Sequence, residues 1–72
     1  MSRHWYIAFQ VLDGNKIVTG FYVIKKSKVI TSEITAYIQS KHSKSSTVVL
    51  LNIFEISTED YRSYPEHCKL NI

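Results

Sequence analysis

Cysteine, glycine and proline are scarce in this chain of 72 residues, which contains one cysteine, two glycines and one proline. The single Cys68 cannot form a disulfide within the chain, and unpaired thiols are typical of reducing compartments. Gly14 and Gly20 stand alone, so there is no glycine-rich phosphate-binding loop. The apolar run at 5–12 is interrupted by Gln10 and is too short for a membrane span or a signal-peptide core. We therefore expect a soluble, cytoplasmic protein with no membrane partner.

The small size and mild charge of the chain restrict its class further. Its length fits one domain, which we place at residues 1–72, with a core at about 4–56 and a C-terminal turn and tail at 57–72. Nine Lys or Arg against six Asp or Glu give a net charge of +3, which does not by itself indicate nucleic acid binding. Domains this small usually need additional stabilisation. With disulfides excluded, we expect good packing and self-association to supply it.

Two strands and a tight turn are predicted near the N-terminus. Residues 5–12 alternate, with large apolar side chains at the odd positions. The sequence Asp13-Gly14-Asn15 supplies residues that tolerate positive φ, which tight hairpin turns require. We therefore predict a second, antiparallel strand over residues 16–25.

The register of this hairpin depends on the length of its loop. A three-residue loop places the odd-numbered residues of the second strand on the Trp5 face, and a two- or four-residue loop places the even-numbered ones there. We favour the three-residue loop because it gathers Phe21 and Val23 with Trp5 and Phe9 in the core. Gly20, in the middle of the strand, predicts a bulge or a close backbone approach.

A helix is predicted from Thr31 or Ser32, since either side chain can cap it. Its apolar stripe consists of Ile30, Ile34, Tyr37 and Ile38. The basic residues Lys41, His42 and Lys44 are expected in its last turn, where cations suit the carbonyl end.

A third strand is predicted over residues 47–56. Its contiguous apolar run, 48–51, is typical of a strand buried on both faces. Residues 57–62 predict a single capped turn, which Pro65 ends.

These elements follow one another in the order β-β-α-β. We predict an α+β fold, in which a three-stranded antiparallel sheet of order 2-1-3 carries one helix on one face. The other face and the edge formed by the third strand are too apolar to be left uncovered. Two covers are considered. One is the C-terminal tail, through Tyr61, Tyr64, Leu70 and Ile72. The other is a second copy, giving a homodimer either by edge pairing of the third strand or by stacking of sheet faces, with self-association through Val48, Leu50, Asn52 and Phe54.

The chain contains no complete set of catalytic or metal-binding residues. The candidates His4, His42, His67 and Cys68 have no paired spacing, and zinc sites need four such ligands. The carboxylates Glu55, Glu59, Asp60 and Glu66 suggest a solvated rim and no paired acid and base. We therefore expect no enzyme, no metal and no cofactor.

The remaining candidates for binding are aromatic and basic. Tyr6 and Tyr22 are the rings that the core needs least, and Lys25, Lys26 and Lys28 follow the second strand directly. We predict a protein-binding module that uses these five residues. The alternative is a small nucleic-acid-binding protein in which the same tyrosines stack bases and the same lysines follow phosphates.

Four short patterns, lying between residues 4 and 56, resemble those of another group of proteins. They are His4-Trp5-Tyr6-Ile7, Gly20-Phe21, the helical stretch 34–38, and the strand 48–55 with its Asn52. Together they resemble short accessory proteins of bacteriophages, prophages and plasmids, most of them uncharacterised. The resemblance implies an inhibitor of a host protein, of the anti-defence type. Many inhibitors that mimic DNA are strongly acidic, whereas this chain is basic, which favours direct docking.

Overall fold

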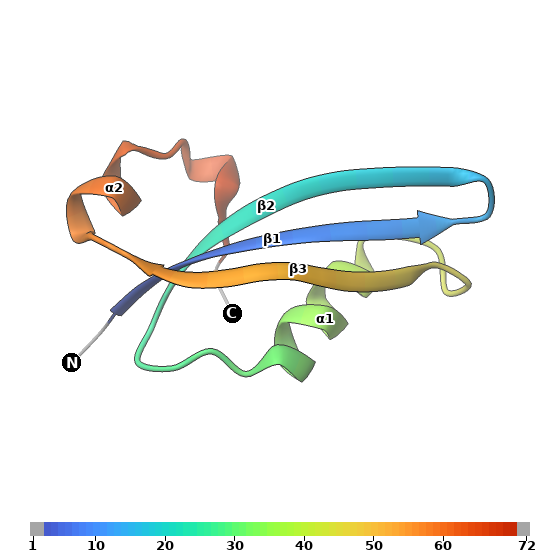
Figure 1. Cartoon of the computed structure of the whole chain (residues 1–72), viewed down its shortest axis with the longest axis horizontal. Helices are drawn as coiled ribbons and strands as arrows, with labels where there is room; N and C mark the ends of the chain where they lie inside the picture. Colours follow the sequence, from blue (N-terminus) through green and yellow to red (C-terminus); the bar gives the residue numbers. More distant parts are fainter. Residues whose placement is uncertain (1–2, 71–72) are drawn as a thin grey trace.

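The computed structural model describes residues 3–70 as a small α+β fold (Figure 1). The elements are β1 (Arg3–Asp13), β2 (Lys16–Lys26), α1 (Thr31–Ser40), β3 (Thr47–Ile56), α2 (Thr58–Ser63), a 3₁₀ turn η1 (Glu66–Cys68) and β4 (Lys69–Leu70).

The sheet has four strands in the order β3-β1-β2-β4. Strand β1 pairs antiparallel with both β2 and β3, and the short β4 pairs parallel with β2. The predicted α+β class is confirmed, and β2, β1 and β3 keep the predicted relative order 2-1-3, but the prediction of a three-stranded, fully antiparallel sheet is wrong. The difference arises because the C-terminal tail returns to the sheet, where Leu70 lies beside Ile24 and is buried.

The hairpin between β1 and β2 turns on two residues, Gly14 and Asn15. Gly14 has a φ of 61°, and no other residue in the range 3–70 has a positive φ. A positive φ at the first turn residue alone is the pattern of a type II′ turn. The predicted hairpin is therefore confirmed, but the favoured three-residue loop is wrong. Trp5 pairs with Ile24, so the even-numbered residues of β2 share its face.

Gly20 makes the close approach that its place in mid-strand predicted. It lies opposite Phe9, and a Cβ added to it would be 2.9 Å from the ring carbon Cζ of Phe9. The ring of Phe9 also stacks on Tyr22, with centroids 5.3 Å apart. The missing side chain of Gly20 therefore makes room for a buried ring.

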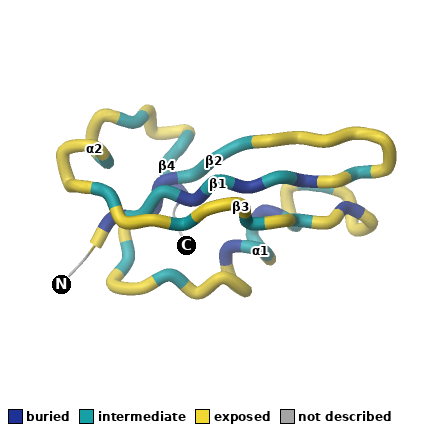
Figure 2. Tube along the Cα trace, in the orientation of Figure 1, coloured by how far each residue is buried: buried dark blue, intermediate teal, exposed yellow. Residues whose placement is uncertain are grey.

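The core lies between the sheet and α1. It consists of Ile7, Phe9, Val11, Ile24, Ile34, Ile38 and Leu70. Figure 2 shows these buried positions concentrated along β1 and on the inner side of α1.

Helix α1 begins at Thr31, as predicted, but its cap and its C-terminal end differ from the prediction. Its N-cap is Ile30, without a side-chain cap, and neither Thr31 nor Ser32 serves as the N-cap. The helix ends at Ser40, so the three basic residues at 41–44 follow the helix, and its last turn contains none. Hydrophobic packing of one helix face, and not capping, therefore accounts for its position.

Strand β3 is an edge strand with a β-bulge. Asn52 pairs with Ala8 and Leu50 pairs with Phe9, so Leu51 is an extra residue without a partner on β1. None of the ten residues of β3 is fully buried. The expectation that this strand is buried on both faces is thus wrong for the single chain, in which only β1 lies beside it.

The C-terminal segment covers one end of the second sheet face. The predicted capped turn is confirmed as α2, whose N-cap Ser57 accepts a hydrogen bond of 3.1 Å from the backbone N–H of Asp60. Tyr61 packs on His4 with ring centroids 4.5 Å apart, and Tyr64 packs on Phe21 at 5.5 Å. The other tail residue predicted to cover the sheet, Ile72, lies outside the described residues.

Candidate protein-binding surface

Three aromatic rings form a row across the sheet on the face opposite α1. Phe54 of β3 stacks on Tyr6 of β1 at 4.9 Å and 24°, and Tyr6 stacks on Phe21 of β2 at 5.2 Å and 15°. Coplanar rings would collide at these separations, so the near-parallel rings must overlap face to face with an offset. Both faces of the Tyr6 ring are therefore occupied by its neighbours.

The row of rings continues into exposed aliphatic side chains toward the hairpin. Leu12 and Ile17 oppose each other near the turn and are 38% and 65% exposed, and Val49 of β3 is 38% exposed. The C-terminal segment covers the other end of this face, as the position of α2 in Figure 1 shows, and its Tyr64 contacts the rings of Phe21 and Tyr6. We call the surface that runs from the three rings to the turn the open face. It comprises Tyr6, Leu12, Ile17, Phe21, Val49 and Phe54.

The open face borders an unpaired strand edge. In the order β3-β1-β2-β4, the outer side of β3 has no neighbouring strand among residues 3–70. Leu51 and Phe54 on this strand are 52% and 44% exposed. An apolar face and an apolar edge thus meet along β3, and exposed surfaces of this kind mark interaction sites.

The two tyrosines predicted to bind a partner lie on opposite faces of the sheet. Tyr6 is at the centre of the open face. Tyr22 faces α1, where it stacks on Phe9 and meets Tyr37 edge-on at 6.1 Å. The two-residue loop sets this arrangement, because it pairs Tyr22 with Ile7 and not with Tyr6.

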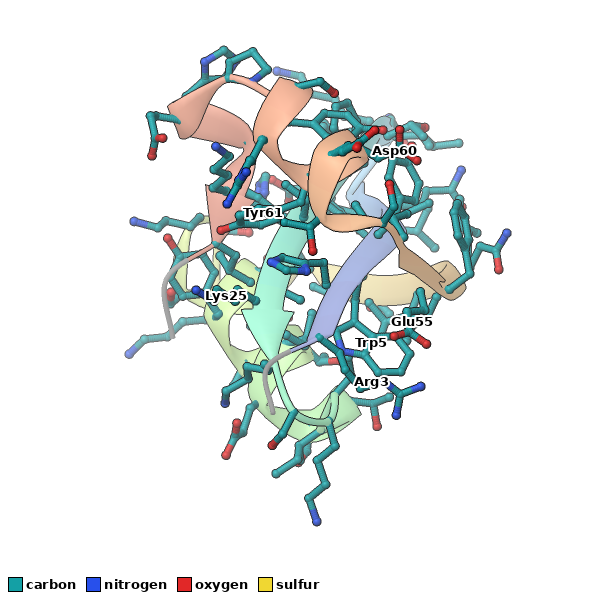
Figure 3. All side chains as sticks on the ribbon, turned by 90° about the vertical axis from the view of Figure 1, so that its left-hand side faces the viewer. Arg3, Trp5, Lys25, Glu55, Asp60 and Tyr61 are labelled. Carbon is teal, nitrogen blue, oxygen red and sulfur yellow. The ribbon has the colours of Figure 1, made fainter. Side chains whose placement is uncertain are left out.

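The three predicted lysines are also separated. Lys25 pairs with His4 at the end of β2 and is exposed, on the same side as the open face (Figure 3). Lys26 donates a hydrogen bond to Glu33 of α1 at 3.1 Å, and Lys28 is exposed in the connection between β2 and α1. Only Tyr6 and Lys25 of the five predicted partner-binding residues therefore share a face.

The four residues predicted to mediate self-association all lie on the edge strand, but the bulge divides them. Val48 and Leu50 pack against the core beneath α1. Asn52 and Phe54 lie beyond the bulge and are exposed on the opposite side. An even-numbered spacing without a bulge would have placed all four on one face.

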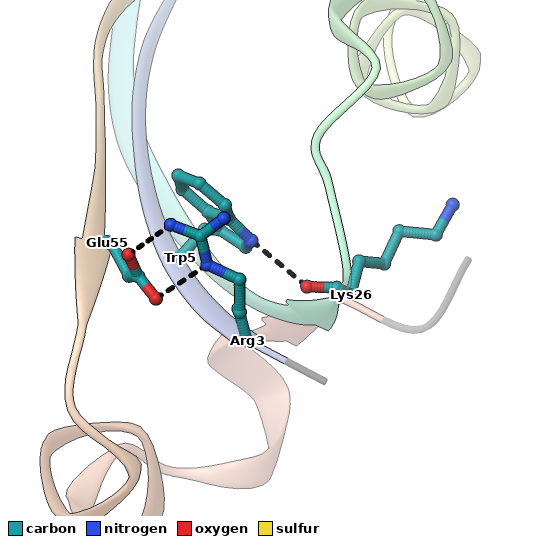
Figure 4. A network of polar contacts seen from close by, with 4 residues as sticks. All are labelled: Arg3, Trp5, Lys26 and Glu55. Carbon is teal, nitrogen blue, oxygen red and sulfur yellow. Dashed lines mark hydrogen bonds and ion pairs between the residues drawn. The ribbon is translucent and has the colours of Figure 1, made fainter. Parts of the chain in front are cut away.

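The only charged side chain of β3 is held by an ion pair at its C-terminal end (Figure 4). Arg3 donates two hydrogen bonds to Glu55, from Nε at 2.8 Å and from Nη2 at 2.6 Å. These bonds lower the pKa of Glu55 from its ordinary value and raise that of Arg3. The Arg3 guanidinium also lies 4.9 Å from the ring centroid of Trp5, whose Nε1 donates to the backbone oxygen of Lys26 at 3.1 Å.

Sequence reasoning missed two of the three rings in the row. It assigned Phe21 to the core, whereas the structure places it on the open face, half-buried beneath Tyr64. It assigned Phe54 to self-association alone. One sequence signal could have placed Phe21 correctly. It is the dipeptide Gly14-Asn15, which suits the two-residue turn of a hairpin.

The described residues form no metal site or pocket. No three His, Cys, Asp or Glu side chains between residues 3 and 70 gather where they could hold a metal ion, and that part of the surface contains no pocket. None of the helices in the same range is long and apolar enough to cross a membrane.

Comparison with known proteins identifies no relative. No protein-family model matches the chain, and no curated protein or solved structure is significantly similar to it. The resemblance to accessory proteins of mobile elements stays a prediction, and a functional proposal has to start from the surface described above.

Proposed function

We propose that this chain is a non-enzymatic protein-binding module and that the open face is its partner site. The observation that supports this is the continuity of the face, in which a row of stacked rings leads to Leu12, Ile17 and Val49, all more than a third exposed. Monomeric proteins rarely leave such large apolar surfaces in water unless a partner uses them. Burial of each exposed aliphatic side chain would contribute about 1 kcal/mol or more to binding.

The stacking of the rings favours a protein partner over a nucleic acid. Single-stranded nucleic acids bind by stacking each base on the flat face of an aromatic side chain. Both faces of Tyr6 are already taken, by Phe54 and Phe21. Apart from Lys25, the predicted lysine cluster lies away from the open face, and Lys26 is paired with Glu33. The ring edges instead present an apolar surface that suits packing against side chains.

The resemblance to accessory proteins of mobile elements adds a biological context to the proposal. In that context the partner is a host protein, and binding inhibits or redirects it. The basic net charge of +3 suits direct docking and does not suit imitation of DNA.

A pair of adjacent substitutions on β2 tests the proposal. Ile17 is on the open face and 65% exposed, whereas Val18 points to the opposite face and is 44% exposed. Ile17→Lys and Val18→Lys therefore make the same chemical change on the same strand, one inside the proposed site and one outside it.

The experiment is a tagged pull-down from host lysate with wild type and both variants, each with and without nuclease. We expect wild type and Val18→Lys to retain one protein at stoichiometric level in both halves, and Ile17→Lys to lose it. Equal recovery by Ile17→Lys would refute the open face as the site. Recovery that disappears with nuclease would favour the nucleic-acid alternative instead.

A further inference from the structure

The outer edge of β3 has only one of the features by which proteins usually limit strand pairing. Exposed edge strands are commonly protected by lysine, proline, an unpaired inward charge or a β-bulge, and of these β3 has the bulge at Leu51. Strand β3 contains neither lysine nor proline, and its one charged residue, Glu55, is bound by Arg3. Its exposed side chains include Val49, Leu51 and Phe54. On either side of the bulge at Leu51, this edge is therefore open to an added strand.

The row of stacked rings ends at this edge. The Phe21 ring contacts both Tyr64 and Tyr6, and the Tyr6 ring contacts both Phe21 and Phe54. Among the described residues, however, the Phe54 ring stacks only on Tyr6. Its outer side faces the position that a further strand would occupy, which explains why this large ring remains 44% exposed. A side chain from an added strand would continue the row by one member.

The bulge determines the register in which a second copy of β3 can pair symmetrically with the first. Side chains alternate between faces along a strand, and directly opposed residues of an antiparallel pair share a face. The extra residue Leu51 shifts this alternation, so residues 47–50 and 52–56 are out of phase. Two copies of β3 therefore oppose side chains of the same face along their length only when residues 47–50 of one copy oppose residues 52–56 of the other.

One register meets this condition for all of residues 47–50 and 53–56. When the two strands are centred between Leu51 and Asn52, Val49 opposes the second copy's Phe54 on the open-face side, and Leu50 opposes its Ile53 on the helix side. Glu55 then opposes the second copy's Val48, so the two carboxylates lie at opposite ends of the interface. Aromatic and β-branched residues that oppose each other are a favourable cross-strand pair.

From these observations we propose that β3 pairs antiparallel with β3 of a second copy, in the register centred between Leu51 and Asn52. The proposal concerns the edge of the sheet, which borders the partner site on the open face and shares Val49 and Phe54 with it. The bulge favours this register, because it opposes four pairs of residues on matching faces, and symmetric registers shifted by one residue on each strand match fewer pairs.

Cysteine cross-linking tests the register. In a Cys68→Ser background, chains carrying Val49→Cys are mixed with chains carrying Phe54→Cys and oxidised. We expect a mixed disulfide, because directly opposed residues bring their Cβ atoms within reach of a disulfide. Thr47→Cys replaces Val49→Cys in the control, since Thr47 lies on the same side two residues further along the strand. A stronger cross-link in the control, or none in either mixture, would overturn the proposal.

Sedimentation equilibrium tests the association itself. We expect wild type to form dimers in the micromolar range and Leu51→Lys, which places a charge at the centre of the interface, to weaken them at least tenfold, or by about 1.4 kcal/mol. Ile17→Lys is the matched control, because Ile17 is more exposed than Leu51 but lies on β2, away from the edge. A monomeric wild type, or equal weakening by both variants, would overturn the proposal. Dimers of Ile17→Lys that no longer capture a partner would show that the two surfaces act separately.

Discussion

The contact between Gly20 and Phe9 allows a prediction in which two opposing effects compete. Replacing a strand glycine with alanine normally stabilises a protein, since it lowers the conformational entropy of the unfolded chain by about 0.4–1 kcal/mol. At Gly20, however, the new Cβ would lie 2.9 Å from Cζ and 3.3 Å from Cε1 of the Phe9 ring. Phe9 is only 6% exposed and is held from another side by Tyr22, so the ring cannot move away freely.

The packing cost should exceed the entropic gain. Inserting a methyl group into a well-packed core typically costs about 1–3 kcal/mol. At the midpoints of the two ranges, subtracting the entropic gain leaves a net destabilisation of about 1.3 kcal/mol for Gly20→Ala. For a domain of this size the total stability is on the order of 5 kcal/mol, so the change is large enough to measure.

Urea unfolding followed by circular dichroism measures the effect, and a double-mutant cycle assigns its cause. Phe9→Leu removes the ring atoms that the alanine would meet. In that background Gly20→Ala should be neutral or stabilising, giving a coupling free energy of about 1–2 kcal/mol between the two sites. If Gly20→Ala stabilises the wild type, or destabilises both backgrounds equally, the steric reasoning is refuted.

Three further predictions test other parts of the fold. Leu70→Ala should lower the free energy of unfolding by about 2–3 kcal/mol, because Leu70 is 4% exposed and belongs to the core. Urea unfolding measures the change, and an unchanged midpoint would show that the tail does not pack against the sheet. Ser57→Ala should cost about 1 kcal/mol, measured by thermal unfolding, because it removes the cap of α2; Ser63→Ala in the same helix is the control. The lowered pKa of Glu55 means that its ionised form contributes stability above the ordinary carboxyl pKa of about 4.3, and that this contribution is lost as the pH falls through the lower pKa of the folded state. The stability difference between wild type and Glu55→Gln should therefore shrink on acidification, and a difference that stays constant with pH would contradict the role of the Arg3 ion pair.

The two proposals have a joint geometric consequence. A two-fold axis perpendicular to the sheet would leave the faces unchanged, so the two open faces would lie side by side and both copies of α1 on the other side. Such a dimer presents two partner sites on one surface. A partner that is itself dimeric would then be bound with a higher effective concentration at the second site.

The sequence by itself determined the features that depend on neighbours in the chain. Alternation over residues 5–12, the Gly14 turn, the apolar stripe of α1 and the Ser57 cap each predicted an element that the structure contains. Tyr6 was also correctly singled out as a ring outside the main core. These signals are local, because side-chain periodicity and backbone conformation are set within a few residues.

The pairing registers of the strands, which sequence reasoning had left open, decided which face each side chain occupies. A turn of two residues in place of three moved Phe21 to the open face and Tyr22 to the core, although no residue type changed. The extra residue at Leu51 likewise separated Val48 and Leu50 from Asn52 and Phe54.

The C-terminal tail shows the same limit of local reasoning. A run of only two residues, Lys69–Leu70, carries no periodicity that could predict a strand, yet it completes the sheet beside β2. Its position depends on a buried site for Leu70 next to Ile24, formed by residues far away in the sequence. Because strand side chains have a period of two, a difference of one residue in a turn or bulge exchanges core and surface, and only the complete packing determines which register has the lower free energy.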